Sequence, residues 1–180
     1  SATLVNKGLE IIEAHYLFGL PYSDIEAVIH PQSVVHSLVE FNDGSTIAQA
    51  SPPNMKGAIA YAMNWPDRLN KSTAPIDWSI PHTWSFAPIN AKQFPSIDLA
   101  RHCGEVGGGL PAIFNAANEA AVAAFISKKL EFKSIVGVIA GVVADLEKDS
   151  PKTLRDLSDV SALEDDARTR AQAHLLRLAP

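Results

Sequence analysis

Three polar side chains near the start of the chain have the types and spacing of a small binding site. Asn6, Lys7 and Glu10 lie in a segment of helical periodicity, where residues three or four positions apart are neighbours on one face. An amide, an ammonium and a carboxylate that converge on one point can hold a hydroxyl group, a phosphate and a divalent cation. The same spacing is also typical of a solvent-facing helix side with an ordinary Lys–Glu pair. From spacing alone, both interpretations stay open.

A second group of candidates is His30, Gln32 and His36. Their even spacing would place them on one face of an unbroken strand, but Pro31 interrupts that pattern. Two histidines together with Glu10 would suit a metal ion, although nothing in the sequence fixes the distances between them. On the sequence alone we favour packing or hydrogen bonding as the role of both histidines.

Other polar or glycine-rich segments favour structural roles. Gly107–Gly109 lacks the preceding strand and the Lys-Ser/Thr pattern of a phosphate loop, so we interpret it as a flexible connection. Asn115, Asn118 and Glu119 interrupt an Ala-rich helical segment and are expected to bond between helices. Cys103, the single cysteine, has no obvious activating partner and permits neither an internal disulfide nor a Cys-rich zinc site.

The composition is that of a globular chain of 180 residues, with 47% apolar and 19% charged side chains. This balance excludes a disordered chain, and the length suits one ordinary domain or two small ones. The longest apolar runs are far shorter than the ~20 residues that cross a bilayer, so we expect a soluble protein without a membrane partner. A net charge of −5 argues against a nucleic-acid partner. The absence of an initiator Met suggests that something precedes residue 1 in the natural protein.

Residues 1–65 mix helix and strand patterns, which makes the expected fold class α+β. Apolar spacing predicts a helix over 4–18, and a capping box at 23–26 predicts a short helical turn. The Asp43-Gly44 corner between β-prone runs predicts a hairpin over 34–49. A short helix is expected over 55–63.

The rest of the chain divides into two parts that differ in composition. Residues 66–94 are rich in proline and are expected to form an extended linker that packs through Trp78, Trp84 and Phe86. Residues 95–180 are helical, with predicted helices over 96–104, 111–129 and 135–146 and a last one that begins at a Ser161-x-x-Glu164 capping box. Four helices with short connections predict a four-helix bundle.

Longer stretches of the sequence resemble a known enzyme family. SATLVNKGLE (1–10) and IHPQSVVHS (29–37) resemble 1-deoxy-D-xylulose 5-phosphate reductoisomerases. The likeness continues through DGS (43–45), AMNWPDR (62–68) and NAANE (115–119), in the family's order and over essentially the whole chain.

The resemblance implies that the chain is a C-terminal fragment of such an enzyme. Family members are longer and begin with an NADPH-binding Rossmann-like domain, for which this sequence has no fingerprint. Residues 1–65 would then be the C-terminal part of the catalytic α/β domain that binds the metal. Residues 66–94 would be the linker, and residues 95–180 the C-terminal four-helix bundle.

The family converts 1-deoxy-D-xylulose 5-phosphate into 2-C-methyl-D-erythritol 4-phosphate in non-mevalonate isoprenoid synthesis. A divalent metal (Mg, Mn or Co) holds two substrate oxygens during the rearrangement, and NADPH delivers a hydride to the resulting aldehyde. The resemblance further implies binding of phosphonate analogues of the substrate and a homodimer. It implies the bacterial cytoplasm as the compartment, or a plastid if the source is plant-like.

Roles for four residues at the start of the chain follow from the family's motifs. Ser1 resembles a phosphate-binding serine, while Asn6 and Lys7 resemble contacts to the phosphate and hydroxyl end of the substrate. Glu10 resembles one of three acidic metal ligands and is therefore an expected catalytic residue that also contacts the substrate site.

Three later residues receive implied roles as well. His36 resembles a histidine close to the site that supports substrate binding, and it is the second expected catalytic residue. Ser33 is a secondary candidate for a substrate contact. Met55 lies in a segment similar to one that borders the nicotinamide of the cofactor.

The resemblance places the other two metal-binding carboxylates and the mobile loop that closes over the substrate before residue 1. We therefore expect the chain alone to be inactive and to bind no cofactor tightly, because Mg²⁺ requires several oxygen ligands. Two alternatives stay open. One is a non-catalytic assembly module that kept the fold, and the other is a divergent relative that acts on another phosphorylated sugar.

Overall fold

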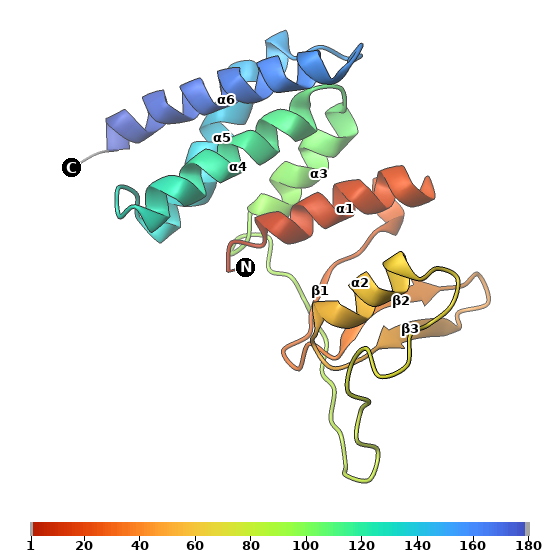
Figure 1. Ribbon diagram of the computed structural model, residues 1–180. Helices are drawn as coiled ribbons and strands as arrows, with labels where there is room; N and C mark the ends of the chain where they lie inside the picture. The colour runs from red at the N-terminus through yellow and green to blue at the C-terminus, as the bar shows by residue number, and fades with distance from the viewer. Residues whose placement is uncertain (1, 179–180) are drawn as a thin grey trace. The chain divides into compact units, whose positions relative to one another are not determined.

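The chain folds into two compact units, which the computed structural model describes over residues 2–178 (Figure 1). The helical unit contains the chain up to Ala27 and again from Ile89 onward, and the hairpin unit contains Val28–Pro88. The first helix thus belongs with the C-terminal helices. The functional division at residues 65–66 and 94–95 stays a prediction, because these units are defined by packing alone.

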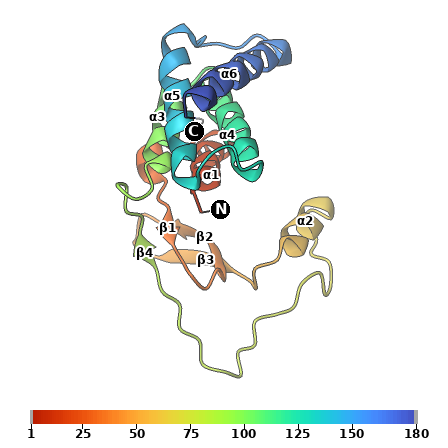
Figure 2. The same ribbon diagram turned by 90° about the vertical axis from the view of Figure 1, so that its left-hand side faces the viewer.

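Within residues 2–178, the helical unit has five α-helices: α1 (Val5–Phe18), α3 (Ser96–Val106), α4 (Leu110–Ile126), α5 (Ile135–Leu146) and α6 (Leu157–Leu178). Three short 3-10 turns lie beside them: η1 (Tyr22–Asp24), η2 (Phe132–Ser134) and η3 (Glu147–Asp149). α4 packs against α5, α6 and α3, which together form the predicted four-helix bundle, and α1 packs along α3 (Figure 2). No helix in this described part of the chain is both long and apolar enough to cross a membrane.

The core of the bundle follows from the apolar stripe of α5. Six side chains of α5 are at most 5% exposed: Ile135, Val138, Ile139, Val142, Val143 and Leu146. Their spacing of three and four positions puts them on one helix face, and burying each of them stabilises the fold by roughly 1.5–3 kcal/mol. On α4, the fully buried Ala116, Ala117 and Ala121 are small, which lets the neighbouring helices approach closely.

The contact between α1 and α3 depends on small and polar residues. A Cβ atom on Gly8 would lie 2.5 Å from the Cβ of Ala100, so the two helices meet where one of them lacks a side chain. Ser96, the first residue of α3, is fully buried and donates a hydrogen bond from Oγ to the carbonyl oxygen of Thr3 at 2.5 Å. The guanidinium of Arg101 donates to the carbonyl oxygens of Tyr22 and Ile25. These contacts attach the N-terminal segment to α3.

The segment Gly107–Gly109, predicted as a flexible connection, forms a tightly packed turn. Gly107 and Gly108 have φ angles of 69° and 59°, in the left-handed region that favours glycine. A Cβ atom on Gly108 would lie 2.1 Å from the carbonyl oxygen of Pro151. The backbone N–H of Gly109 donates to that same oxygen at 3.0 Å. The turn between α3 and α4 therefore lies directly against the segment that precedes α6.

The hairpin unit contains two antiparallel strand pairs: β1 (Val28–Ile29) with β4 (Ala87–Pro88), and β2 (Val35–Glu40) with β3 (Thr46–Ala50). The Asp43-Gly44 corner forms the predicted turn between β2 and β3. Gly44 has a φ of 82°, and Asp43 Oδ1 accepts hydrogen bonds from the backbone N–H and the hydroxyl of Ser45 at 2.8 and 2.6 Å. These hydrogen bonds lower the pKa of the Asp43 carboxyl. The expected fold class, α+β, is confirmed.

The rest of the hairpin unit is one helix and a long proline-rich segment. α2 (Met55–Met63) has the predicted bounds, and the Asn54 side chain caps it by accepting from the Lys56 N–H at 2.9 Å. The aromatic rings of the proline-rich segment contact one another or nearby residues. The ring centroids of Trp78 and Trp84 are 5.9 Å apart, and Phe86 stacks on His30 at 4.5 Å.

Two helix starts differ from the sequence prediction. The capping box predicted at 23–26 yields only η1, after which the backbone is extended at Ile25. α6 begins at Leu157, before the predicted Ser161, because Asp156 Oδ1 accepts from the N–H groups of Ser158 and Asp159 at 2.8 and 3.3 Å. A carboxylate therefore caps α6 about one turn earlier than the Ser161 box would.

Replacing Ser96 with alanine should loosen the start of α1. The variant removes the buried donor to Thr3, and we expect the free energy of unfolding to fall by about 1–2 kcal/mol in urea denaturation. Ser127→Ala at an exposed position should leave it within about 0.5 kcal/mol. Faster amide exchange in the first turn of α1, relative to α5, would identify the affected segment. Unchanged exchange there would contradict the role given to Ser96.

The glycine turn gives a second prediction with a built-in contrast. Gly108→Ala should lower the free energy of unfolding by about 2–4 kcal/mol, because the added methyl meets backbone atoms at a positive φ. Gly137→Ala, on an exposed part of α5 where a Cβ atom would have no neighbour within 4 Å, should raise it by about 0.5–1 kcal/mol. Thermal unfolding followed by circular dichroism compares the two. Equal effects would mean that the turn is not tightly packed.

Candidate functional site

The Asn6, Lys7 and Glu10 side chains converge at the start of α1. Asn6 Nδ2 donates to Glu10 Oε1 at 2.7 Å, and the Lys7 ammonium contacts Glu10 Oε2. The carboxylate thus has one neutral and one charged donor, each on a different oxygen. The predicted convergence of these three residues is confirmed, while their roles in chemistry stay predictions.

The position of this cluster is determined by the backbone before α1. Leu4 has a φ of 55°, a left-handed conformation that is uncommon for a leucine, and Val5 begins the helix directly after it. The Thr3 Oγ1 atom accepts from the Val5 N–H at 3.4 Å, and the Thr3 carbonyl accepts from the buried Ser96. Ser1, the predicted phosphate-binding serine, lies outside the described residues.

The cluster is open to solvent, which sets the strength of its contacts. The side chains of Lys7 and Glu10 are 42% and 45% exposed. An ion pair with this much exposure contributes only about 0–1 kcal/mol to stability. The ion pair can therefore open at little cost in stability. The Lys7 ammonium is then able to bind an anion, and the Glu10 carboxylate a cation.

The described residues supply only part of a metal site. Glu10 is a carboxylate of the type that hard divalent cations prefer. However, residues 2–178 contain no group of three or more His, Cys, Asp or Glu side chains that could together hold a metal ion. Glu10 fits the chemistry of one ligand, and a complete coordination shell requires oxygen atoms from elsewhere.

His36 lies in the hairpin unit, on β2. Its Nε2 atom is 3.0 Å from the carbonyl oxygen of Ser51, which follows the end of β3. The ring is exposed. Nearby in sequence, Ser33 has a φ of 50° and closes a tight turn by donating its N–H to the His30 carbonyl at 3.0 Å. Strained backbone of this kind is enriched at functional sites, which is consistent with the candidate role of Ser33.

His30 has structural contacts, as predicted. Its Nδ1 atom is 2.9 Å from the carbonyl oxygen of Ser85, and its ring stacks on Phe86. The Gln32 side chain also bonds Ser85, donating to its hydroxyl at 3.1 Å and accepting from its N–H at 3.2 Å. His30 and Gln32 therefore attach the turn after β1 to the segment before β4.

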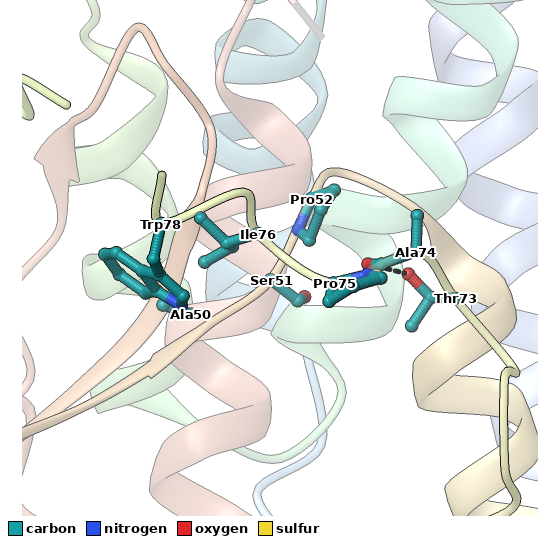
Figure 3. Close-up of a pocket in the computed structure, with 8 residues that line it drawn as sticks. All are labelled: Ala50, Ser51, Pro52, Thr73, Ala74, Pro75, Ile76 and Trp78. Atoms are coloured by element: carbon teal, nitrogen blue, oxygen red, sulfur yellow. Dashed lines mark hydrogen bonds between the residues drawn. The ribbon is translucent and has the colours of Figure 1, made fainter. Parts of the chain in front are cut away.

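Met55, the predicted neighbour of the cofactor, is the first residue of α2 and is 70% exposed. Close to it in sequence, the residues Ala50–Pro52 line a pocket of about 320 Å³ together with residues of the loop from Thr73 to Trp78 (Figure 3). Sequence reasoning missed both this pocket and the contact of Ser51 with His36. The doublet Pro52-Pro53 indicates that β3 ends before it. No sequence pattern predicts that the loop from Thr73 to Trp78 packs beside this point.

Cys103 has the structural role that the sequence predicts, and of the polar residues on α4 that were expected to bond between helices, Glu119 does so. Burial raises the pKa of the Cys103 thiol to about 12, with the Glu147 carboxylate as a further cause, which excludes a thiolate nucleophile at neutral pH. Asn115 donates to Glu119 at 3.3 Å, and Glu119 in turn accepts from Arg168 of α6 at 3.4 Å. The polar motif on α4 thus connects α4 with α6.

Among the predicted site residues, the structure brings together Asn6, Lys7 and Glu10 in the helical unit. Ser33, His36 and Met55 belong to the hairpin unit, in which His36 is held by the backbone after β3.

The comparison with protein families supports the resemblance seen in the sequence. The family described as "DXP reductoisomerase C-terminal domain" matches residues 50–170. The 1-deoxy-D-xylulose 5-phosphate reductoisomerase of Mycobacterium marinum is 50% identical over 182 residues, covering 100% of this chain and 44% of that protein. The enzyme of the same name from Kitasatospora griseola is 51% identical over 172 residues, covering 96% and 45%.

Solved structures agree with the sequence relatives. The Zymomonas mobilis 1-deoxy-D-xylulose 5-phosphate reductoisomerase in complex with NADPH has a TM-score of 0.89 at 39% identity, over 97% of this chain and 46% of that one. A DOX-P reductoisomerase in complex with NADPH, fosmidomycin and magnesium has a TM-score of 0.93 at 36% identity, over 98% and 45%. The chain spans less than half the length of these relatives. It belongs to the 1-deoxy-D-xylulose 5-phosphate reductoisomerase family.

Proposed function

We propose that the chain is the C-terminal part of an enzyme that converts 1-deoxy-D-xylulose 5-phosphate into 2-C-methyl-D-erythritol 4-phosphate. The observation that carries this proposal is the cluster at the start of α1, in which an amide and an ammonium meet one carboxylate. Family membership suggests a sugar phosphate as the substrate. Such a molecule offers hydroxyl groups and a phosphate, which the amide and the ammonium of the cluster are able to bind. The intact cluster also argues against a non-catalytic module that has kept only the fold.

Each residue of the cluster binds a different group of the ligands. Lys7 holds the substrate phosphate as a point charge, and Asn6 donates to the phosphate or an adjacent hydroxyl. Glu10 would supply one oxygen to a divalent cation (Mg, Mn or Co), which would leave Lys7 and Asn6 free to bind the substrate. When bound, the metal would polarise substrate oxygens and NADPH would supply the hydride, and residues outside this chain would hold most of both.

The hairpin unit contributes the other candidate residues. His36 and Ser33 contact the substrate, and Met55 borders the nicotinamide of NADPH. In the helical unit, Ser1 adds a phosphate contact. The enzyme is a cytoplasmic homodimer, and the exposed apolar side chains of the hairpin, Leu38, Val39, Phe41 and Ile47, support a contribution of this hairpin to the dimer interface.

Because Glu10 is one ligand of several, the chain alone should be inactive. We expect turnover when it is combined with a separately produced N-terminal part of a relative such as the Mycobacterium marinum enzyme, with substrate, Mg²⁺ and NADPH. Glu10→Gln keeps the shape of the side chain and removes its charge, and it should lower turnover at least about 100-fold. Absorbance of the reduced cofactor measures the rate.

Glu131→Gln provides the matched control, since Glu131 is exposed and lies just before η2, far along the chain from the cluster on α1. Its rate should equal that of the unmodified chain. If a verified complex of the two folded parts shows no turnover, the chain is an assembly module or acts on another phosphorylated sugar. Turnover by the chain alone would contradict the partial metal site.

The phosphate role of Lys7 predicts a change in substrate affinity. In the reassembled enzyme, Lys7→Gln should raise the KM for the substrate by about 10- to 100-fold, which is the effect of losing a charged hydrogen bond. Lys148→Gln, at an exposed position of η3, should leave KM unchanged. A change of less than about threefold for Lys7→Gln would favour the alternative of an ordinary solvent-facing ion pair.

A further inference from the structure

His36 occupies a break in the register of the hairpin. Val35 pairs with Ala50, but Ser37 pairs with Gln49, so the pairing shifts by one residue between them. His36 is therefore the extra residue of a β-bulge. Bulges redirect a side chain out of the regular alternation of a strand, and they are enriched next to active sites.

Ser51 holds this bulge from both sides with its backbone. Its N–H donates to the carbonyl of Val34 at 2.9 Å, and its own carbonyl oxygen lies 3.0 Å from His36 Nε2. A carbonyl oxygen only accepts hydrogen bonds, so the proton of the neutral imidazole must be on Nε2. Within residues 2–178, Nδ1 of His36 has no hydrogen-bond partner, and the ring is exposed.

We propose that the Ser51 carbonyl fixes His36 as the Nε2–H tautomer, so that Nδ1 accepts a hydrogen bond from a hydroxyl group of the sugar phosphate. The second half of this inference rests on the proposed function. A neutral Nδ1 carries a lone pair, which repels the acceptor oxygens of a phosphate and suits an O–H donor. His36 thus serves the hydroxyl part of the substrate, and Ser51 is a positioning residue that acts through its backbone.

Ser51 is itself supported on its other side. It lines the pocket of about 320 Å³, where Pro75 and Ile76 of the returning loop lie close to it (Figure 3). Its hydroxyl accepts from the Gln49 side chain at 3.4 Å, but this contact does not involve the carbonyl. The tautomer therefore depends on the backbone of residue 51 and not on its side chain.

His30 provides an internal control, because its geometry is the reverse. Its Nδ1 atom, not Nε2, faces a backbone carbonyl, that of Ser85 at 2.9 Å. One spectrum should therefore contain both tautomers: Nε2–H for His36 and Nδ1–H for His30.

The test is a long-range ¹H–¹⁵N correlation spectrum of the 180-residue chain with labelled histidine rings, recorded at about pH 8, where free imidazole is neutral. His36→Gln and His30→Gln assign the two signals by their loss. We expect the acceptor-type nitrogen shift on Nδ1 for His36 and on Nε2 for His30. An Nδ1–H pattern or rapid averaging for His36 would overturn the proposal.

Two variants of residue 51 separate backbone from side chain. Ser51→Ala keeps the carbonyl and should leave the His36 pattern unchanged. Ser51→Pro removes the N–H that bonds Val34, and should shift His36 towards averaged tautomers while His30 stays as it is. If Ser51→Pro disrupts the hairpin, the unmodified chain and Ser51→Ala still decide the question.

Kinetics of the reassembled enzyme test the hydroxyl contact. His36→Asn can place an amide oxygen near the Nδ1 position, whereas His36→Gln reaches only the Nε2 position. We expect His36→Gln to raise KM by about 3- to 10-fold and His36→Asn by less, with kcat nearly equal. Equal KM values in an active enzyme would overturn the hydroxyl contact. An inactive unmodified enzyme would instead refute the proposed function, and with it the hydroxyl contact, although the tautomer would stand.

Discussion

The hydrogen bond between the buried Ser96 hydroxyl and the Thr3 carbonyl is the contact on which the position of the Asn6, Lys7 and Glu10 cluster depends. It joins residues far apart in the sequence and fixes the backbone just before α1 begins. Asn6, Lys7 and Glu10 follow within the first two turns of that helix, so their place relative to α3 is set before any of their own contacts form. The close approach at Gly8 then keeps α1 against α3 along its length.

Backbone carbonyls play a similar part for the histidines of the hairpin unit. His30, His36 and His82 each have one ring nitrogen within 3.0 Å of a carbonyl oxygen, those of Ser85, Ser51 and Asp77. A carbonyl cannot be substituted away and does not titrate, so it orients an imidazole more permanently than a carboxylate would. In the helical unit, His15 Nδ1 likewise lies 2.6 Å from the Leu20 carbonyl oxygen, whereas His102 and His174 pair with the Glu147 and Asp145 carboxylates. Backbone carbonyls thus orient all three histidines of the hairpin unit, but only His15 among the histidines of the helical unit.

The sequence predicted the parts of the structure that depend on local patterns. The apolar stripe of α5, the bounds of α2 and the Asp43-Gly44 turn all arise from residues within a few positions of one another. The spacing of Asn6, Lys7 and Glu10 likewise sufficed to predict that they meet, because a helix fixes such distances. The binding roles proposed for them rest on family resemblance, since the same spacing also describes an ordinary surface ion pair.

Features that depend on distant contacts escaped prediction. The bulge at His36 requires knowledge of how β2 and β3 pair, and the order of Gly107–Gly109 requires the segment at Pro151 to be in place. The start of α6 was missed for a local reason. Asp156 caps the helix by accepting hydrogen bonds from two N–H groups, so the helix begins before the Ser161 box. Leu4 was assigned to the helix, although its positive φ places it outside.

The helical unit is assembled from two stretches of chain that the hairpin unit separates. Because β1 and β4 pair so that Val28 lies opposite Pro88, the outgoing and returning strands run side by side, about 5 Å apart. The hairpin unit is therefore an insertion with both of its ends at one place. The entropy cost of closing a loop grows only slowly with loop length, so such an insertion can lengthen or shorten with little effect on the helices. The helical unit is therefore a host domain and the hairpin unit an insertion into it, so each unit can change in evolution with little effect on the other.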